Sequence, residues 1–389
     1  MKFANRENLI IKGLVEFSWE TLANHRGDIL LYQERNTKPD ELIDESDKLA
    51  DRYSSEDNIA LTELDKATRM GRPKRRHPPP IIAVDAGVVN LGSLAKGGIV
   101  FAVRGTACFY TSEGSIIVLR YNTGAIAIDN TNKLEVLHQM GKYLGEAEFY
   151  VEVIEKEPFL REKSSFTETA DQTQDRFRNF VERIIQAEAV GILKKYGGGI
   201  LLIDGAITPR AFDTPDSYVK NLLDECNKNL IDVVAISKKT TITVAGIPIQ
   251  KFLTEAYGPD FIGYVPIKKL LEDERRKAQK AGGKNRIRVT KAKEMYAARF
   301  GFSPTSMTFR VDLHNCRGMT TDEVINDVYN YCRIYGGYPK PLIEAHQNSC
   351  FLFQDFQNLL AQATVRLGSK PQSQPSMDIL FIPFGASGK

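Results

Sequence analysis

The stretch Ile200-Leu-Leu-Ile-Asp204-Gly205 decides the fold, because four aliphatic residues run directly into a carboxylate and a glycine. A short apolar run of this length predicts a strand that is buried on both faces of a sheet. Open α/β sheets bind their ligands at the C-terminal ends of such strands. An Asp-Gly pair is also common in ordinary turns, so a plain turn after a core strand is the alternative for this stretch alone.

A second copy of the pattern favours a functional site. Ile81-Ile-Ala-Val-Asp85-Ala-Gly87 is again a short apolar run that ends in an aspartate. Two buried strands that bring aspartates to one edge of a sheet are unfavourable, because the carboxylates repel each other and lose hydration. A bound divalent cation would offset that cost. We therefore expect Asp85 and Asp204 to form a metal site.

A third carboxylate comes from a helix expected between Asp171 and about Tyr196. On a helical wheel Glu188 lies in the middle of the apolar face and Glu182 lies near its edge. A carboxylate that faces a core needs a partner, which singles out Glu188; a salt bridge to Arg or Lys is the alternative. The apolar residues that define this face are Phe177, Phe180, Val181, Ile184, Ile185 and Ile192.

The remaining pattern is that of a mixed α/β protein. Residues 1–70 are expected to form a helical extension, 71–80 (GRPKRRHPPP) a basic, proline-rich linker, 81–367 the main domain and 368–389 a tail. The order strand, meander, helix, strand predicts a mixed sheet flanked by helices, with one carboxylate from each of three elements. Further strands are expected at 98–103, 107–110, 115–120, 230–236 and 307–313, and further helices at 217–229, at 320–331 and from the GGYPKP segment at 336–341 to about 365.

Composition bounds the class of protein. The chain has 389 residues, 42% of them hydrophobic and 26% charged, which is ordinary for a globular protein. No run is long enough for a membrane span, and the N-terminus lacks the apolar core of a secretory signal. Five scattered cysteines without a CxxC pair indicate reduced thiols and a cytoplasmic location, and disfavour a zinc knuckle.

Positive charge is concentrated although the net charge is only +3. Residues 268–293 hold eleven Lys and Arg against three acidic residues, and Arg72–Arg76 holds four cations in five residues. Such clusters favour contact with nucleic acid, and the alternative is a solvated basic loop. Lys238, directly after a predicted strand, either contacts a phosphate or faces solvent. The other DNA-binding candidates are Arg275, Arg276, Lys277, Lys284, Arg286 and Arg288.

Strand-end aspartates with a helical glutamate are the residues that a metal-dependent phosphodiesterase needs. Their oxygen atoms suit Mn²⁺ or Mg²⁺, which can orient water and stabilise a leaving oxygen. His346 is a candidate ligand or proton shuttle, with a structural helix residue as the alternative. The chain has no GxSxG motif for a nucleophilic serine, and no P-loop or GxGxxG motif.

In their order, these motifs resemble those of the NurA nuclease family over roughly residues 81–350. The most specific pieces are Leu202-Ile-Asp-Gly205 and Gly337-Tyr-Pro-Lys-Pro-Leu-Ile-Glu-Ala-His346. The resemblance implies an RNase H-like core and a Mn²⁺-dependent exonuclease and single-strand endonuclease. It also implies a ring-like homodimer that acts in DNA end resection and double-strand break repair with a hexameric HerA-type ATPase.

Residue by residue, the resemblance matches Asp85 and Asp204 to the family's metal-binding aspartates and His346 to its C-terminal active-site histidine. It matches Glu182 to the glutamate of an Arg-xxx-Glu pattern, whereas the apolar face favours Glu188, so both remain candidates. The sequence departs from the family at Asp85-Ala-Gly, where Asp-Gly-Ser is usual.

Two other functions are compatible with the same residues. A non-catalytic DNA clamp that stimulates a motor ATPase would keep the basic clusters without the acidic site. An actin or Hsp70-like ATPase also places Asp-x-Gly loops at strand ends, although the sequence shows no second, similar half.

Overall fold

The computed structural model describes residues 16–31, 67–70, 78–129, 131–139, 170–209, 216–272, 290–332 and 335–367, with a few positions left out inside some of these stretches. Its main element is a mixed sheet in the order β2-β11-β12-β13-β8-β7-β3-β4-β5, with β1 paired to β3 and β6 paired to β4. The strands of this sheet are β1 (Ile29–Leu31), β2 (Thr68–Arg69), β3 (Ile81–Leu94), β4 (Ile99–Tyr110), β5 (Ile116–Asn122), β6 (Ile126–Ile128), β7 (Gly199–Asp204), β8 (Ile231–Ser237), β11 (Gly263–Pro266), β12 (Glu294–Arg299) and β13 (Phe309–His314).

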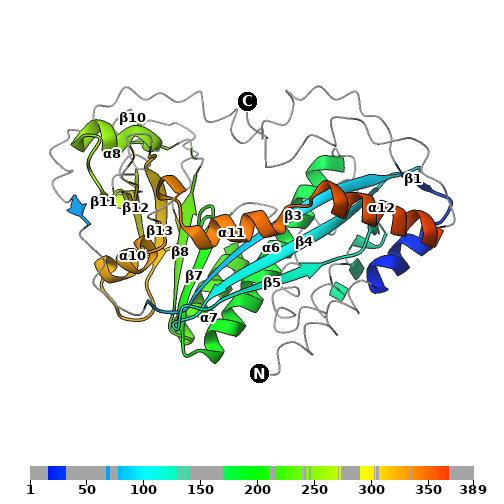
Figure 1. Ribbon diagram of the computed structural model, residues 1–389, viewed down its shortest axis with the longest axis horizontal. Helices are drawn as coiled ribbons and strands as arrows, with labels where there is room; N and C mark the ends of the chain where they lie inside the picture. The colour runs from blue at the N-terminus through cyan, green and yellow to red at the C-terminus, as the bar shows by residue number, and fades with distance from the viewer. Residues whose placement is uncertain are drawn as a thin grey trace.

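Helices cover both faces of this sheet. They are α6 (Ala170–Lys195), α7 (Asp216–Lys228), α8 (Ile249–Tyr257), α10 (Thr321–Tyr329), a 3-10 turn η5 (Tyr335–Gly337), α11 (Lys340–Ser349) and α12 (Phe353–Leu367). A separate hairpin joins β9 (Thr243–Val244) to β10 (Ile247–Pro248). In Figure 1, α11 and α12, coloured orange to red, follow one another along β3.

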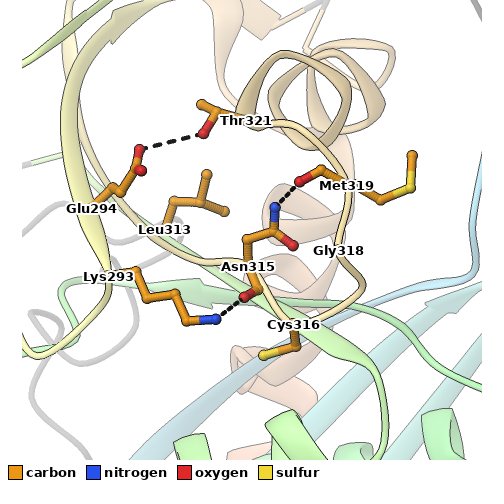
Figure 2. A pocket seen from close by; sticks show the side chains of 8 residues that line it. All are labelled: Lys293, Glu294, Leu313, Asn315, Cys316, Gly318, Met319 and Thr321. Carbon is orange, nitrogen blue, oxygen red and sulfur yellow. Dashed lines mark hydrogen bonds between the residues drawn. The ribbon is translucent and has the colours of Figure 1, made fainter.

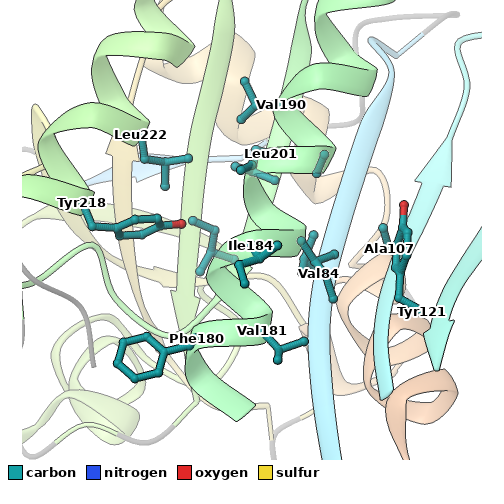
Figure 3. Close-up of a cluster of buried hydrophobic side chains, with 14 of the residues drawn as sticks. Val84, Ala107, Tyr121, Phe180, Val181, Ile184, Val190, Leu201, Tyr218 and Leu222 are labelled. Carbon is teal, nitrogen blue, oxygen red and sulfur yellow. The ribbon is translucent and has the colours of Figure 1, made fainter. Parts of the chain in front are cut away.

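The centre of the sheet is parallel and buried on both faces. β3 pairs with β7, and β7 with β8, in parallel register, while the other pairs are antiparallel. Successive side chains of a strand alternate between faces. Val84, Leu201 and Ile203 therefore pack against α6 and α7, whereas Ala83, Ile200 and Leu202 pack against α10 and α11. Figure 3 shows the first of these layers, in which Val84 and Leu201 lie close to α6.

Most predicted elements are confirmed. The mixed sheet, the long helix now seen as α6, and the strands that deliver Asp85 and Asp204 all lie where the apolar periodicity placed them. The α/β architecture with flanking helices is thus observed, and an RNase H-like core stays a prediction.

Three expectations are wrong in detail. The strands expected at 98–103 and 107–110 are one continuous strand, β4, because Arg104, Gly105 and Thr106 pair on both sides. The single final helix is broken into α11 and α12, because Cys350 adopts extended dihedral angles. The N-terminal extension is not only helical: residues 16–24 are helical, but β1 and β2 add strands to the main sheet.

Several expectations fall outside the described residues. These are most of the extension (1–15 and 32–66), the basic part of the linker (71–77), the tail (368–389) and the segment 273–289, which carries Arg275, Arg276, Lys277, Lys284, Arg286 and Arg288. Within the part of the chain that is described, no helix has the length and apolar character needed to cross a membrane.

Candidate active site

Asp85 and Asp204 lie side by side on one face of the sheet. Val84 of β3 pairs with Ile203 of β7 in parallel register, so the next residues along the two strands, Asp85 and Asp204, are neighbours. Adjacent strands are about 4.8 Å apart, and residues in register point to the same side. Alternation places both aspartates on the face covered by α11. The sequence thus positions the two aspartates on adjacent strands, with their side chains on the same face of the sheet.

The buried carboxylate of Asp85 is held by the end of α11. Its Oδ2 accepts hydrogen bonds from His346 Nδ1 at 2.8 Å and from Ser349 Oγ at 2.9 Å. Burial alone raises the pKa of Asp85, but the hydrogen bond and positive charge of His346 outweigh it and hold that pKa below its usual value. The same hydrogen bond, together with the contact of Nε2 with Cys350 Sγ, raises the pKa of His346 to about 10. At neutral pH the pair is therefore an ionised aspartate beside a protonated imidazole.

Asp204 has a different cation. Lys238 donates from Nζ to Asp204 Oδ2 at 2.8 Å, and the same ammonium lies 4.4 Å from the centroid of the Tyr338 ring. Burial, together with the negative charge of Asp204, raises the pKa of the Tyr338 phenol well above its usual value. Tyr338 thus stays protonated beside Asp204. The Lys238 side chain is 38% exposed, so it remains accessible to a solvent-borne anion.

The loop after Asp204 is fixed from two neighbouring strands. Gly205 has φ +123°, a conformation that favours glycine, and its carbonyl accepts from Ser237 Oγ at 2.6 Å. Asp312 Oδ2 accepts the backbone N–H of Ile207 at 2.9 Å, and Arg310 pairs with the same buried carboxylate. These bonds hold the turn, and with it the backbone of Asp204, against the rest of the sheet.

Glu182 approaches the pair from α6, on the other face of the sheet. It is 7% exposed, and its Oε1 accepts from Arg183 at 3.0 Å and from Gln186 at 3.1 Å. Burial raises the pKa of Glu182, and the negative charges of Asp85 and Asp204 raise it further, against the effect of Arg183. This carboxylate is therefore close enough to both aspartates to feel their charge.

The two candidate glutamates occupy different surroundings. Glu188 is half-buried and lies six residues after Glu182, which is about 9 Å farther along α6. The structure brings Glu182, the residue at the edge of the apolar face, toward the strand ends, and leaves Glu188 farther along the helix. Helical periodicity favoured Glu188 as the site residue, because periodicity does not reveal where the adjoining strand ends.

The acidic site is neutralised within the chain itself. We expected a bound cation to offset the repulsion, but His346 pairs with Asp85, Lys238 with Asp204 and Arg183 with Glu182. Among the described residues, no three His, Cys, Asp or Glu side chains stand close enough to form a complete metal site. Two adjacent carboxylates with a third nearby still fit Mn²⁺ or Mg²⁺, since such ions take one or two carboxylates and complete their shell with water and phosphate oxygens.

Two contributors were missed at the level of sequence. Tyr338 lies in the GYPKP segment before the final helix. The prolines of this segment predict the start of a helix, and nothing in the pattern indicates that Tyr338 lies beside Asp204. Ser349 carries no sequence signal, because its role depends on the end of α11 resting on β3.

A cavity of about 410 Å³ lies elsewhere (Figure 2). It is lined by Lys293, Asn315, Cys316 and their neighbours. His314, directly before this loop, pairs with Val233 near the start of β8, whereas Asp204 pairs with Ile236 near the end of that strand. The cavity is therefore at the opposite edge of the sheet from the aspartates, and it adds nothing to their site.

No protein-family model matches the chain, and no curated protein matches it. The chain is similar in structure to the NurA nuclease from Sulfolobus solfataricus, with 14% identity, a TM-score of 0.45, and coverage of 85% of this chain and 96% of that one. It is also similar to NurA bound to dAMP and manganese, with 13% identity, a TM-score of 0.37 and coverage of 82% and 94%. Sequence identities and TM-scores this low assign no function to the chain. The comparison shows that the chain is similar to NurA structures over most of its length.

Proposed function

We propose that this chain is a divalent-metal-dependent deoxyribonuclease that hydrolyses phosphodiester bonds in DNA. One observation carries the proposal: Asp85 and Asp204 follow paired residues of adjacent parallel strands, and the buried Glu182 lies within reach of their charge. Titratable groups from distant parts of the chain that converge in this way are found more often at functional sites than elsewhere. The resemblance of the sequence motifs to NurA nucleases points to the same chemistry.

Asp85 and Asp204 would hold the metal, and Glu182 would add its charge from the other face of the sheet. When bound, a divalent cation supplies a polarised phosphate and an activated water. The cations already in the site then have a second role. Lys238 and His346 both have exposed surface, so each can turn from a carboxylate toward a phosphate oxygen of the substrate.

His346 is suited to act as an acid. In the metal-free site its Nδ1 donates to Asp85, which orients the ring. Because the pKa of His346 is raised to about 10, Nε2 also carries a proton at neutral pH. Nε2 lies 3.9 Å from Cys350 Sγ, and the ring is 47% exposed, so the Nε2 proton can reach a leaving oxygen.

The test replaces each aspartate by its neutral isostere. We expect Asp85→Asn and Asp204→Asn to reduce Mn²⁺-dependent cleavage of single-stranded DNA by about 100-fold or more, the scale of losing an electrostatic contributor to a transition state. Asp216→Asn is the matched control, because Asp216 is 62% exposed and pairs with Lys291 at the surface. Circular dichroism of each variant checks that the fold is kept. Cleavage at the wild-type rate by either site variant contradicts the proposal.

Two alternatives give different results in the same preparation. A non-catalytic clamp would bind DNA and leave it intact with every divalent metal. An actin or Hsp70-like ATPase would bind ATP in a calorimeter, which the nuclease would not.

From the sequence resemblance we further propose that the protein acts as a cytoplasmic homodimer in DNA end resection with a hexameric HerA-type ATPase. Light scattering of the purified chain, alone and mixed with such an ATPase, measures both associations.

A further inference from the structure

Two large apolar side chains are exposed at the corner between α11 and α12. Leu352 is 63% exposed and Phe353 is 41% exposed. The inward side of the same corner is well packed, since Phe351 and Phe356 join the cluster that contains Trp19 and Leu91. The corner thus has enough apolar residues to anchor itself and presents two more to solvent.

The corner is held rigidly by one arginine of β4. Arg104 donates from Nη1 to the Cys350 carbonyl at 2.9 Å and to Asp355 Oδ2 at 3.0 Å, and its guanidinium lies 4.5 Å from the Phe351 ring centroid. The same Asp355 oxygen accepts the backbone N–H of Leu352 at 2.9 Å. Leu352 and Phe353 are therefore exposed from a fixed backbone, and binding there requires little ordering of the chain.

This corner adjoins the acidic site on the same face of the sheet. Ser349, which donates to Asp85, is four residues before Phe353. Four residues span at most about 14 Å. A strand whose phosphate lies at Asp85 and Asp204 has bases within reach of Phe353.

An exposed cation lies in the same row of the sheet. Asp85 pairs with Thr106 of β4, and Thr106 pairs with Arg120 of β5, so the three side chains share one face. Arg120 also donates a hydrogen bond to Asn348 at the end of α11, and its positive charge helps to lower the pKa of Asp355. A guanidinium therefore lies two strands from Asp85 on the same face of the sheet, close to the end of α11 and to Asp355.

We propose that Phe353 and Leu352 form a base-stacking subsite for single-stranded DNA, with Arg120 contacting the phosphate of the stacked nucleotide. This inference rests on the proposed nuclease function. An aromatic ring next to a cation is the combination that binds single strands without reading their sequence. The neighbouring cation and the short distance to Asp85 favour a nucleotide over a second copy of this chain, because an apolar contact between two copies requires neither a cation nor proximity to the acidic site.

The experiment combines Phe353 variants with single abasic nucleotides placed along a short fluorescent oligonucleotide. Binding is measured by anisotropy in EDTA, so that no cleavage occurs. For the wild-type chain, one abasic position should weaken binding by about five- to 150-fold, the range for loss of one base–aromatic stack. Phe353→Ala should weaken binding to the intact strand by a similar factor and should no longer respond to that abasic position. Phe353→Tyr keeps the ring and should behave as the wild type does.

Val365→Ala is the matched control, because Val365 is an 80% exposed apolar residue on the same helix, about 18 Å along α12 from Phe353. It should bind like the wild type. The subsite is refuted if the wild type binds and cleaves DNA while Phe353→Ala retains the wild-type abasic profile. It is equally refuted if Phe353→Ala changes only the oligomeric state in light scattering, which would make the corner a protein interface. A wild-type chain that neither binds nor cleaves DNA overturns the proposed function together with the subsite.

Discussion

Gly87 is the point at which the backbone of α11 rests on the strand that carries Asp85. A Cβ atom added at Gly87 would lie 2.2 Å from the carbonyl oxygen of Ser349, whereas real Cβ contacts are essentially never shorter than 3.0 Å. Gly87→Ala therefore forces the end of α11 away from β3 by about 0.8 Å. The hydrogen bond from Ser349 Oγ to Asp85 is 2.9 Å long, so the same displacement carries it past the distance at which a hydrogen bond survives.

The loss of stability has three contributions. Crowding in a packed interior costs about 1 to 3 kcal/mol, and loss of a hydrogen bond to a charged acceptor costs about 1.5 to 3 kcal/mol. Alanine also restricts the conformations of the unfolded chain, which stabilises the folded state by about 0.4 to 1 kcal/mol. We expect the free energy of unfolding of Gly87→Ala, measured with urea, to be about 2 to 5 kcal/mol below that of the wild type.

A double-mutant cycle isolates the hydrogen bond from the crowding. Ser349→Ala should destabilise the wild-type chain by about 1.5 to 3 kcal/mol, but should add little in the Gly87→Ala background, where the bond is already broken. Gly114→Ala is the control: a Cβ there meets nothing within 4 Å, although φ of +86° makes alanine unfavourable. In that background the effect of Ser349→Ala should be fully additive. Additivity with Gly87→Ala, or a loss below about 1 kcal/mol for that variant, would show that α11 does not rest on β3 as described.

Two further predictions concern stability. Burial lowers the pKa of His314 to about 4, against 6.5 in the unfolded chain. Because the folded chain binds this proton more weakly, the free energy of unfolding should fall as the pH drops from about 6.5 toward 4. At pH about 5 the loss should be about 2 kcal/mol. Urea titrations at several pH values should show a flatter decline for His314→Gln, and an equal decline would contradict the assignment. Arg299 is fully buried and donates to four backbone carbonyls, those of Pro259, Phe261, Ser303 and Ser306. Arg299→Met leaves these carbonyls unsatisfied, so it should lower the free energy of unfolding by about 3 kcal/mol or more. A melting temperature within 1 °C or so of the wild type would disprove this role.

The sequence predicts the strand-end aspartates because their signal is local. An apolar run that ends in Asp is readable from six residues, and the order of the two runs with α6 between them is enough to predict a mixed sheet. The break between α11 and α12 is different, since residues 340–367 have no glycine or proline at the break. The helix ends where Ser349 bonds to Asp85 and Arg104 takes the Cys350 carbonyl. Both partners are more than 200 residues away in sequence, where no periodicity can show them.

Helical periodicity could not decide between Glu182 and Glu188 for a similar reason. A helical wheel shows which residues face the sheet, but not which of them lies level with the end of a strand. Position along the helix axis depends on how α6 packs against β3 and β7, a tertiary property. The same limit applies to β1 and β2, whose two or three residues form strands only because β3 and β11 offer free edges to pair with.

The pairing of each acid with its own cation determines how the site would respond to metal and substrate. Asp85 with His346 and Asp204 with Lys238 make the metal-free site compatible with folding, because a buried carboxylate without a partner costs several kcal/mol. A divalent cation that takes the two carboxylates leaves the imidazolium and the ammonium without partners, and both have exposed surface. A DNA phosphate restores the balance of charge by pairing with them. Metal and phosphate should therefore bind more tightly together than either does alone, so that the acidic cluster and its cations work as one site for the metal-bound substrate.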